Sequence, residues 1–380
     1  MKKNDNLLCS ISNKSYYEKL TEGKGIFLDI ETTGLKKDIC SVYLIGLLYP
    51  EYKDPVRSYR LSLLFSEDPS EESLILNELF KILENTDFRA ITFNGRHFDL
   101  PFLRKRYEIH GLKIPEALQN GTDIDIYAEL RPCRRSFGLS HLDQKSIEKM
   151  LDIKREDRYS GKELIDVYKE YVITKDPALY DLLITHNRDD VLGMAEILPV
   201  LSYPEIFKRA SDPAPGSFDI KSIDVESHRG FDGEENSELM ISFTLPVSVP
   251  KPRLFHNYRL FLETFDNEGV LRIPLTQGEL KHFFENYKDY CYIPSEDKAV
   301  LKEIASIMTT AETEKAKASN CYIKTKGLFL PLPEGFSFPD GTVYRQDYKS
   351  KTEYILYSED IKKSPALEEY LLQVLGKCFR

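Results

Sequence analysis

The stretch FLDIETTGL (27–35) places two carboxylates, Asp29 and Glu31, at the end of an apolar run that is typical of a buried strand. Residues two apart in a strand project to the same face, so we expect both carboxylates on one face of a sheet. Burying charge without a partner is costly, and a hard divalent ion with oxygen ligands is the simplest partner for two neighbouring anions. Taken alone, the pair fits a solvent-facing turn equally well.

The segments around this strand alternate between strand-like and helix-like patterns, which indicates an α/β layered domain. GIFLDIE (25–31) and SVYLIGLLY (41–49) are typical of neighbouring strands, and AITFN (90–94) of a third. Helices are predicted for 72–85 and for 100–111, whose last residue is a glycine, a common helix ending. In the first of these helices the apolar residues at helical spacing are Leu74, Leu76, Leu79, Phe80 and Leu83.

The breaker-rich stretch RASDPAPGSF (209–218) marks a change of character. We expect a first domain over 1–208, a linker over 209–217 and a second domain over 218–380. The second domain is predicted to be a smaller α+β module. Its expected strands are 238–249, 258–266, 270–275, 321–331 and 342–358, and its expected helices are 278–290, 295–308 and 366–377.

Two further segments of the first domain carry acidic residues. FNGRHFDLPFL (93–103) places Asp99 at the start of a predicted helix, where an acidic residue is often only a dipole partner or a cap. In the helical stretch 182–201, His186 and Asp190 are four apart and share one face. An isolated pair of this kind is usually a surface or capping interaction, so neither segment decides by itself.

In order along the chain, DIETTGL, FNGRHFDLPFL and HNRDDVL resemble the three exonuclease motifs of the DEDD superfamily, which has the ribonuclease H-like fold. The resemblance covers roughly residues 24–202 and, more narrowly, is to the YprB-type ribonuclease H-like proteins of bacteria. It implies a three-layer domain with a mixed sheet flanked by helices. The acidic set that it implies is Asp29, Glu31, Asp99 and Asp190.

The resemblance also implies a chemistry, which is 3′–5′ exonuclease hydrolysis at single-stranded ends with two divalent ions about 4 Å apart. Mg²⁺ is the expected ion, and Mn²⁺ is expected to substitute. In the family, the first-motif aspartate, here Asp29, bridges the ions. Glu31 and Asp190 would hold one ion, and Asp99 the other.

His186 occupies a position that one branch of the superfamily fills with tyrosine, four residues before the last aspartate. The histidine branch places its histidine one residue earlier, where this chain has Thr185. Three roles for His186 stay open. It would accept a proton from the attacking water, or orient that water, or support Asp190.

Further residues near the motifs are candidates for contacting the substrate strand, although Gly34 is equally explained by a turn and Phe98 by core packing. These candidates are Thr32, Thr33, Gly34, Leu35, Asn94 and Phe98. Asp123 and Asp125 are interpreted as caps or supporting groups rather than metal ligands. Three loop arginines are interpreted as a solvated loop rather than a phosphate track, namely Arg131, Arg134 and Arg135.

Composition narrows the function classes. The chain has 380 residues and a net charge of −10, which argues weakly against a nonspecific polyanion coat but leaves nucleic acid open as a substrate. Its apolar runs are shorter than the roughly 20 residues of a membrane span. The six cysteines are too sparse for a disulfide framework, so we expect reduced thiols and a cytoplasmic protein.

The second domain carries basic residues interleaved with aromatic ones in CYIKTKG (321–327) and VYRQDYKSK (343–351). This pattern is compatible with single-strand binding, with a protein-binding surface, or with an ordinary exposed face. The alternatives to an exonuclease are a catalytically silent nucleic-acid-binding protein of the same fold and a structure-specific endonuclease. The sequence leaves both DNA and RNA open as substrates.

Overall fold

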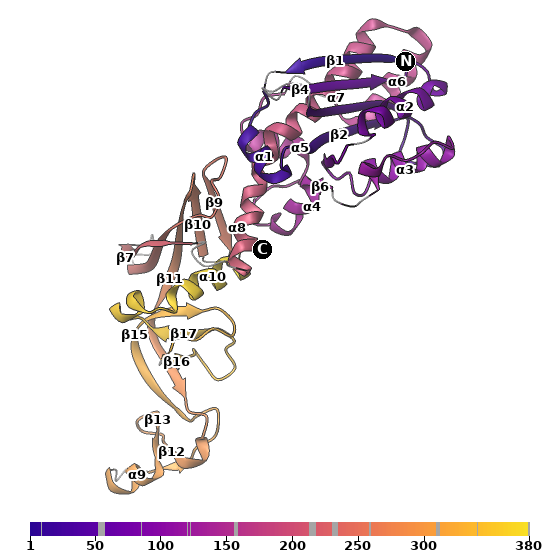
Figure 1. Ribbon diagram of the computed structural model, residues 1–380. Helices are drawn as coiled ribbons and strands as arrows, with labels where there is room; N and C mark the ends of the chain where they lie inside the picture. Colours follow the sequence, from indigo (N-terminus) through magenta and orange to yellow (C-terminus); the bar gives the residue numbers. More distant parts are fainter. Residues whose placement is uncertain are drawn as a thin grey trace. The chain divides into compact units, whose positions relative to one another are not determined.

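The computed structural model describes residues 1–8, 10–51, 58–84, 86–119, 121, 123–155, 159–212, 218–229, 235–257, 260–308, 312–339 and 341–378 (Figure 1). The chain divides into two compact units, Met1–Pro204 and Glu205–Arg380. Each unit is described by itself.

The first unit is built on a six-stranded mixed sheet (Figure 1). The three pairs formed by the first four strands are antiparallel, whereas the two pairs formed by the last three are parallel. In spatial order the strands are β1 (Lys2–Leu8), β4 (Tyr59–Phe65), β3 (Val42–Pro50), β2 (Gly25–Thr32), β5 (Arg89–Thr92) and β6 (Ile124–Asp125).

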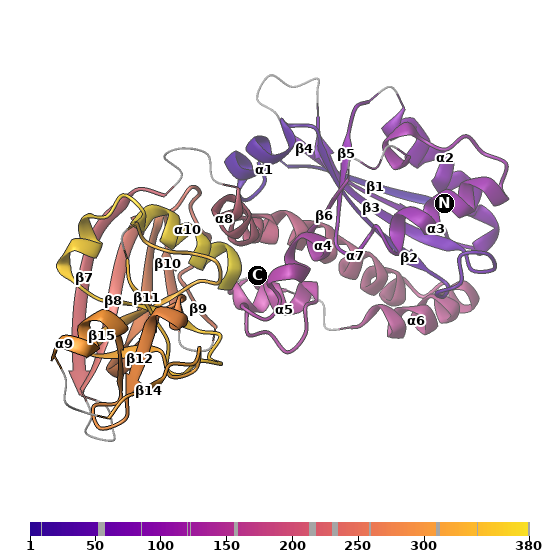
Figure 2. The ribbon, with the colours of Figure 1, turned by 90° about the horizontal axis from the view of Figure 1, so that it is seen from below.

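Helices cover both faces of this sheet (Figure 2). On one face, α2 (Glu72–Leu83) and α3 (Asp99–Ile109) pack on the strands in one apolar core. On the other face, α7 (Pro177–Ile197) packs on β2 and β3, and α5 (Gln144–Met150) and α6 (Gly161–Thr174) pack on α7. The three layers confirm the predicted α/β class.

The side chains of β2 alternate between these two layers, as the period of two requires. Ile26, Leu28 and Ile30 enter the core shared with α2 and α3. Phe27 points to the opposite face, where its ring stacks on Tyr17 of α1 (Lys14–Thr21) at 5.8 Å between centroids. Asp29 and Glu31 follow Phe27 in the same register, so the strand directs its two carboxylates toward α7.

Helix α2 buries a different stripe from the predicted one. Leu74 is 49% exposed, whereas Ile75, Leu76, Leu79 and Leu83 are buried. The helix is rotated so that Ile75 faces the sheet, and Glu72 at its start is buried by an ion pair with Arg106 at 2.6 Å and by a contact with His110 at 2.8 Å. A buried charge of this kind is retained because it is paired.

The remaining helices of the first unit are α4 (Ile126–Leu130) and the start of α8 (Ser202–Ser211), which continues into the second unit. Helix α8 extends through Ser211, into the range of the predicted linker 209–217. Residues 213–217 lie outside the described residues, so the linker stays a prediction. In the described part of the chain, no helix is long and apolar enough to cross a membrane.

The second unit contains an eight-stranded and a three-stranded antiparallel sheet (Figure 2). The larger sheet consists of β7 (Ile220–Arg229), β8 (Glu235–Thr244), β9 (Arg253–Asn257), β10 (Leu260–Phe265), β11 (Glu268–Phe283), β15 (Tyr322–Leu332), β16 (Val343–Tyr344) and β17 (Glu353–Leu356). The smaller consists of β12 (Tyr290–Ile293), β13 (Lys298–Leu301) and β14 (Glu314–Lys315). Besides the end of α8, the helices among its described residues are α9 (Lys302–Met308) and α10 (Leu367–Cys378), so strands and helices are both present, as expected.

Two predicted helices of this unit are wrong in whole or in part. Residues 278–283, expected to begin a helix, continue β11, because Thr276–Phe283 pairs with Tyr322–Phe329 of β15. Residues 298–301, expected in the middle of a helix, form β13 against β12. In both places the local apolar spacing fits a helix, but pairing with a distant strand decides the structure.

Candidate active site

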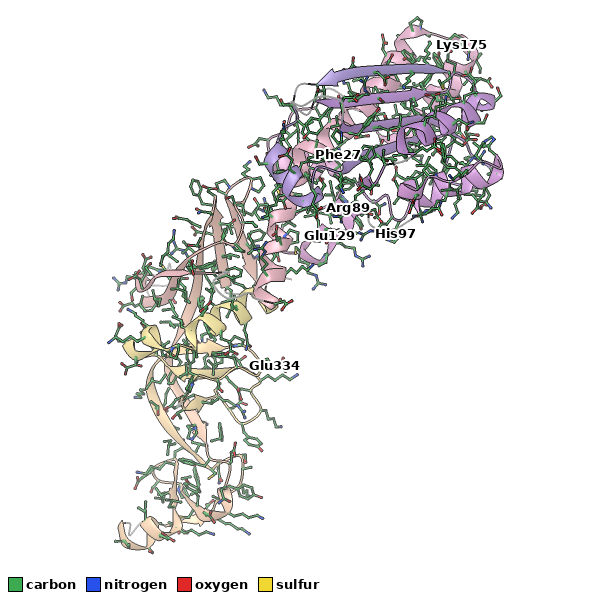
Figure 3. The ribbon with its side chains drawn as sticks, viewed as in Figure 1. Phe27, Arg89, His97, Glu129, Lys175 and Glu334 are labelled. Atoms are coloured by element: carbon green, nitrogen blue, oxygen red, sulfur yellow. The ribbon has the colours of Figure 1, made fainter. Side chains whose placement is uncertain are left out.

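Side chains of α7 contact both carboxylates of strand β2. Asn187 Nδ2 donates a hydrogen bond of 2.6 Å to Asp29 Oδ2. His186 Nε2 lies 3.3 Å from Glu31 Oε1 and 3.0 Å from Asp190 Oδ2. The predicted pairing of His186 with Asp190 on one helix face is therefore present, and Glu31 of the neighbouring strand joins it. Phe27, which precedes the two carboxylates on β2, is labelled in Figure 3.

Asp99 reaches the same end of β2 from the layer of α3. Pairing of β2 with β5 ends at Phe27 and Ile91, so the following part of β2 has no β5 partner in the ladder. Ile30 N, in this part, donates a hydrogen bond of 3.1 Å to Asp99 Oδ1. Asp99 is only 6% exposed. It is thus a buried carboxylate fixed against the strand, rather than a solvated cap.

The acidic side chains act on one another electrostatically. Burial raises the pKa of Asp29 well above its ordinary value, and the charges of Asp190, Asp99 and Glu31 add to this effect. Burial also raises the pKa of Asp99 to about 7, with further contributions from Asp125 and Asp190. A group of carboxylates that disfavour one another's ionisation is a site to which a cation would bind favourably.

Asp190 is the exception within this group. Burial opposes its ionisation, but hydrogen bonds and charge from His186 and Arg155 outweigh burial and lower its pKa. Arg155 donates from its guanidinium to Asp190 Oδ1 at 2.5 Å, opposite the oxygen that His186 contacts.

The donor atoms suit a divalent cation. One ligand atom from each of Glu31, His186 and Asp190 lies within 4.8 Å of the others. Carboxylate oxygens are the ligands that Mg²⁺ and Mn²⁺ prefer, and imidazole is accepted by Mn²⁺ and other transition metals. Asp29 and Asp99 do not belong to this group of three. They would provide two further carboxylates beside it.

Of the substrate-contacting residues predicted at the end of the first motif, Thr32 is the last residue of β2, and Thr33, Gly34 and Leu35 lie in the connection to β3. Thr32 is buried and its hydroxyl donates to the carbonyl of Gly34 at 2.9 Å, while Thr33 Oγ1 accepts from Ser41 N at 2.9 Å. A Cβ at Gly34 would lie 2.8 Å from Cys40 Sγ, so this glycine is explained by a close approach. Leu35 is 79% exposed and is the residue of this group best placed to touch another molecule.

The residues predicted around the second motif have mixed roles. Asn94 has a left-handed backbone with φ of 65°, and its N–H donates 2.8 Å to Asp125 Oδ1. Phe98 is half-buried and its ring lies 5.4 Å from that of Phe102 in the core. His97 (labelled in Figure 3) and Phe98 line a hollow that Leu35 also lines.

Asp125 and Asp123 are a cap and a supporting group, as expected. Asp125 accepts from Ala128 N at 3.2 Å and caps α4, and its other oxygen accepts from Arg96 N at 3.0 Å. Asp123 pairs with Arg96 at 2.6 Å. These contacts hold the turn before α3. The three loop arginines, Arg131, Arg134 and Arg135, are exposed.

Sequence reasoning missed the residues that support the carboxylates. Asn187 follows His186 directly, and adjacent helical residues normally diverge, yet both meet β2 because α7 lies over the strand. Arg155 and its buried partner Glu148 come from outside the three motifs. Their charge and spacing carry no local signal, since their role depends on the packing of α5 on α7.

Residues 26–202 match the family model described as RNase_H superfamily. The first unit has a ribonuclease H-like fold. The match supports a nuclease of the ribonuclease H-like type, which agrees with the acidic site.

Several solved structures are similar to this chain. E. coli Exonuclease I in complex with a dT13 oligonucleotide shares 10% identity at a TM-score of 0.32, over 58% of this chain and 54% of that chain. A second Exonuclease I structure, described in terms of processivity, shares 11% identity at a TM-score of 0.31 over the same shares of the two chains. A nuclease in its apo form shares 16% identity at a TM-score of 0.25, over 54% of this chain and 93% of that chain. The similarity therefore spans about half the length of the Exonuclease I chains (54%), and no curated protein matches.

Proposed function

We propose that the protein is a metal-dependent nuclease, and specifically a 3′–5′ exonuclease of the DEDD type acting on single-stranded ends. The observation that carries the proposal is the convergence of carboxylates from three elements. Asp29 and Glu31 come from β2, Asp99 from α3 and Asp190 from α7. The charges of Asp190, Asp99 and Glu31 all raise the pKa of Asp29, which supports this convergence.

These side chains would hold two divalent ions, Mg²⁺ by default with Mn²⁺ as a substitute. Asp29 would bridge them, Glu31 and Asp190 would hold one, and Asp99 the other. Bound ions would neutralise charge on the scissile phosphate and lower the pKa of the attacking water. Water adds to the phosphorus and the bond to the 3′ oxygen breaks, so each cycle leaves a new 3′-hydroxyl and releases a 5′-monophosphate.

The chain's own residues prepare this site in three ways. Asn187 fixes one oxygen of Asp29, and Ile30 N fixes one oxygen of Asp99, so both carboxylates have a set orientation. His186 contacts Glu31 and Asp190 together. This geometry supports a role for His186 in orienting Asp190, and its Nε2 stays a candidate acceptor for a proton from the attacking water.

The proposal is tested by trimming of a 5′-labelled single-stranded oligonucleotide. We expect a ladder of shortened products with Mg²⁺ or Mn²⁺, no products with EDTA, and none from Asp29→Asn. Matched DNA and RNA strands identify the substrate, and a circular strand separates exonuclease from endonuclease cleavage. Binding without cleavage under every metal condition would contradict the proposal and favour a silent binding protein. The YprB-type affiliation and a cytoplasmic location stay predictions.

A further inference from the structure

Asp190 is held from two sides, by a residue of its own helix and by a residue of another segment. His186, one turn earlier on α7, contacts Oδ2 at 3.0 Å. Arg155, from the segment between α5 and α6, donates to Oδ1 at 2.5 Å. His186, which contacts Oδ2, also lies 3.3 Å from Glu31 Oε1, whereas Oδ1 accepts from Arg155. The contact with Arg155 therefore helps to determine which oxygen of Asp190 is turned toward the other acidic groups.

Arg155 is itself fixed. Its side chain is 10% exposed, and its Nη1 donates to both carboxylate oxygens of Glu148, at 3.1 and 3.2 Å. Glu148 on α5 is 2% exposed, so its charge is compensated inside the protein. Gln144, also on α5, donates to Glu148 Oε1 at 2.8 Å and to the Asp190 carbonyl at 2.9 Å. The network therefore links α5, Arg155 and α7.

The space for this network between α5 and α7 depends on one residue of α7, Gly193. A Cβ at Gly193 would lie 2.2 Å from Glu148 Oε1 and 2.8 Å from Gln144 Nε2. Any side chain at this position would displace the Glu148 carboxylate, which accepts from Arg155, and the Gln144 amide, which donates to Glu148. The glycine is helical and its backbone requires no special φ, so the close approach of α5 to α7 explains it.

We propose that Arg155 is a positioning residue for Asp190, which keeps Oδ2 directed toward the metal site while Glu148 balances its charge. The proposal rests on the metal site of the proposed function. Two effects of removing Arg155 have opposite signs. Loss of a positive charge beside the site would strengthen cation binding by simple electrostatics. Loss of orientation would weaken it, as for other groups that hold a metal ligand, by about 10- to 100-fold.

The test measures Mn²⁺ affinity by isothermal titration calorimetry on the full chain without nucleic acid. We expect Arg155→Met to bind Mn²⁺ at least about 10-fold more weakly than the wild type. Arg155→Lys keeps the charge, but its ammonium lacks the planar guanidinium that contacts Glu148 and Asp190 at the same time, so we expect a similar loss of affinity. Arg188→Met is the matched control, because Arg188 lies on α7 and pairs with Asp189, and the affinity of this variant for Mn²⁺ should be unchanged.

Each outcome decides the proposal. Equal or tighter Mn²⁺ binding in either Arg155 variant, with a wild-type circular dichroism spectrum, would overturn the positioning role. If Arg155→Met does not fold because Glu148 is left unpaired, the double variant Arg155→Met with Glu148→Gln removes that charge, and the same loss is expected. A wild type that binds no Mn²⁺ would overturn the metal site as well, whereas normal wild-type binding with unchanged variants overturns only the role of Arg155.

Discussion

His186 is 4% exposed and contacts two carboxylates that belong to different elements. We predict that His186→Ala lowers kcat about 10²-fold or more, because it removes either a proton acceptor or the group that orients Asp190 and the water. Single-turnover trimming of a labelled oligonucleotide measures this effect. His186→Gln restores a hydrogen-bonding group without a base at neutral pH, so recovery in this variant indicates an orienting role. Near-wild-type turnover of the alanine variant would exclude both roles.

Asp99 makes the stability of the metal-free protein depend on pH. Its pKa is raised from 3.8 to about 7 by burial, so the folded state holds a proton that the unfolded state has already lost in this range. The stabilisation is complete below about pH 4 and is lost as the pH rises through about 7. We predict that Asp99→Asn gains stability relative to the wild type over this window. Urea unfolding with EDTA at several pH values measures the difference, and a constant difference would contradict the assignment.

At the residue scale, the sequence predicted the features that follow from the periodicity of a single strand or helix. The shared face of Asp29 and Glu31 follows from strand alternation, and the pairing of His186 with Asp190 follows from helical spacing. The partners Asn187 and Arg155 depend on how α7 meets β2 and α5, which is tertiary packing that no local pattern encodes.

At the scale of elements, the site depends on how closely α7 approaches the sheet. Gly46 of β3 is paired with Asp29 in register, and a Cβ at Gly46 would lie 2.1 Å from Asn187 Oδ1 and 2.7 Å from Val191 Cγ2. We predict that Gly46→Ala costs about 1–3 kcal/mol of unfolding free energy through overpacking. It should also weaken Mn²⁺ binding, because it moves the helix that carries His186. Urea unfolding and calorimetry measure the two effects.

Gly161 provides a matched control for this substitution. It begins α6, and a Cβ there would meet nothing within 4 Å. Gly161→Ala should leave stability unchanged or slightly increased, since alanine loses less entropy in a helix. Equal effects of the two substitutions would contradict the close packing of α7 on β3.

Helices and strands were predicted correctly where the local sequence pattern favours the same structure as packing with the neighbouring elements. The strand 25–31 and the helix 182–201 have clear periods and are present as β2 and α7. The segment 278–290 failed because its apolar residues also fit a strand, and β15 provides the partner that selects it. Helix α2 was predicted correctly, but its buried stripe was off by one position at Leu74 and Ile75.

At the scale of the whole molecule, we propose that the first unit carries the chemistry and that the second unit adds contacts that hold the substrate. The carboxylate site lies wholly within the first unit. In the second unit, Phe283 and Tyr348 pack edge to face with ring centroids 5.6 Å apart, and Lys281 lies over the Tyr322 ring at 4.4 Å. Aromatic and cationic side chains gathered in this way are suited to stacking and backbone contact with single strands. The ordinary alternative is an exposed face with no ligand.

We predict that Tyr348→Ala raises KM for a single-stranded oligonucleotide about 10-fold and leaves kcat unchanged, because base stacking is worth about 1–3 kcal/mol and acts before the chemical step. Tyr348 is 46% exposed, so its removal should not disturb folding. Phe265→Ala is the control, since Phe265 is 63% exposed on β10 and belongs to no such cluster among the described residues. Steady-state trimming separates the two constants. A change in kcat alone, or equal KM values for both variants, would remove the second unit from substrate holding and leave its aromatic cluster as ordinary surface.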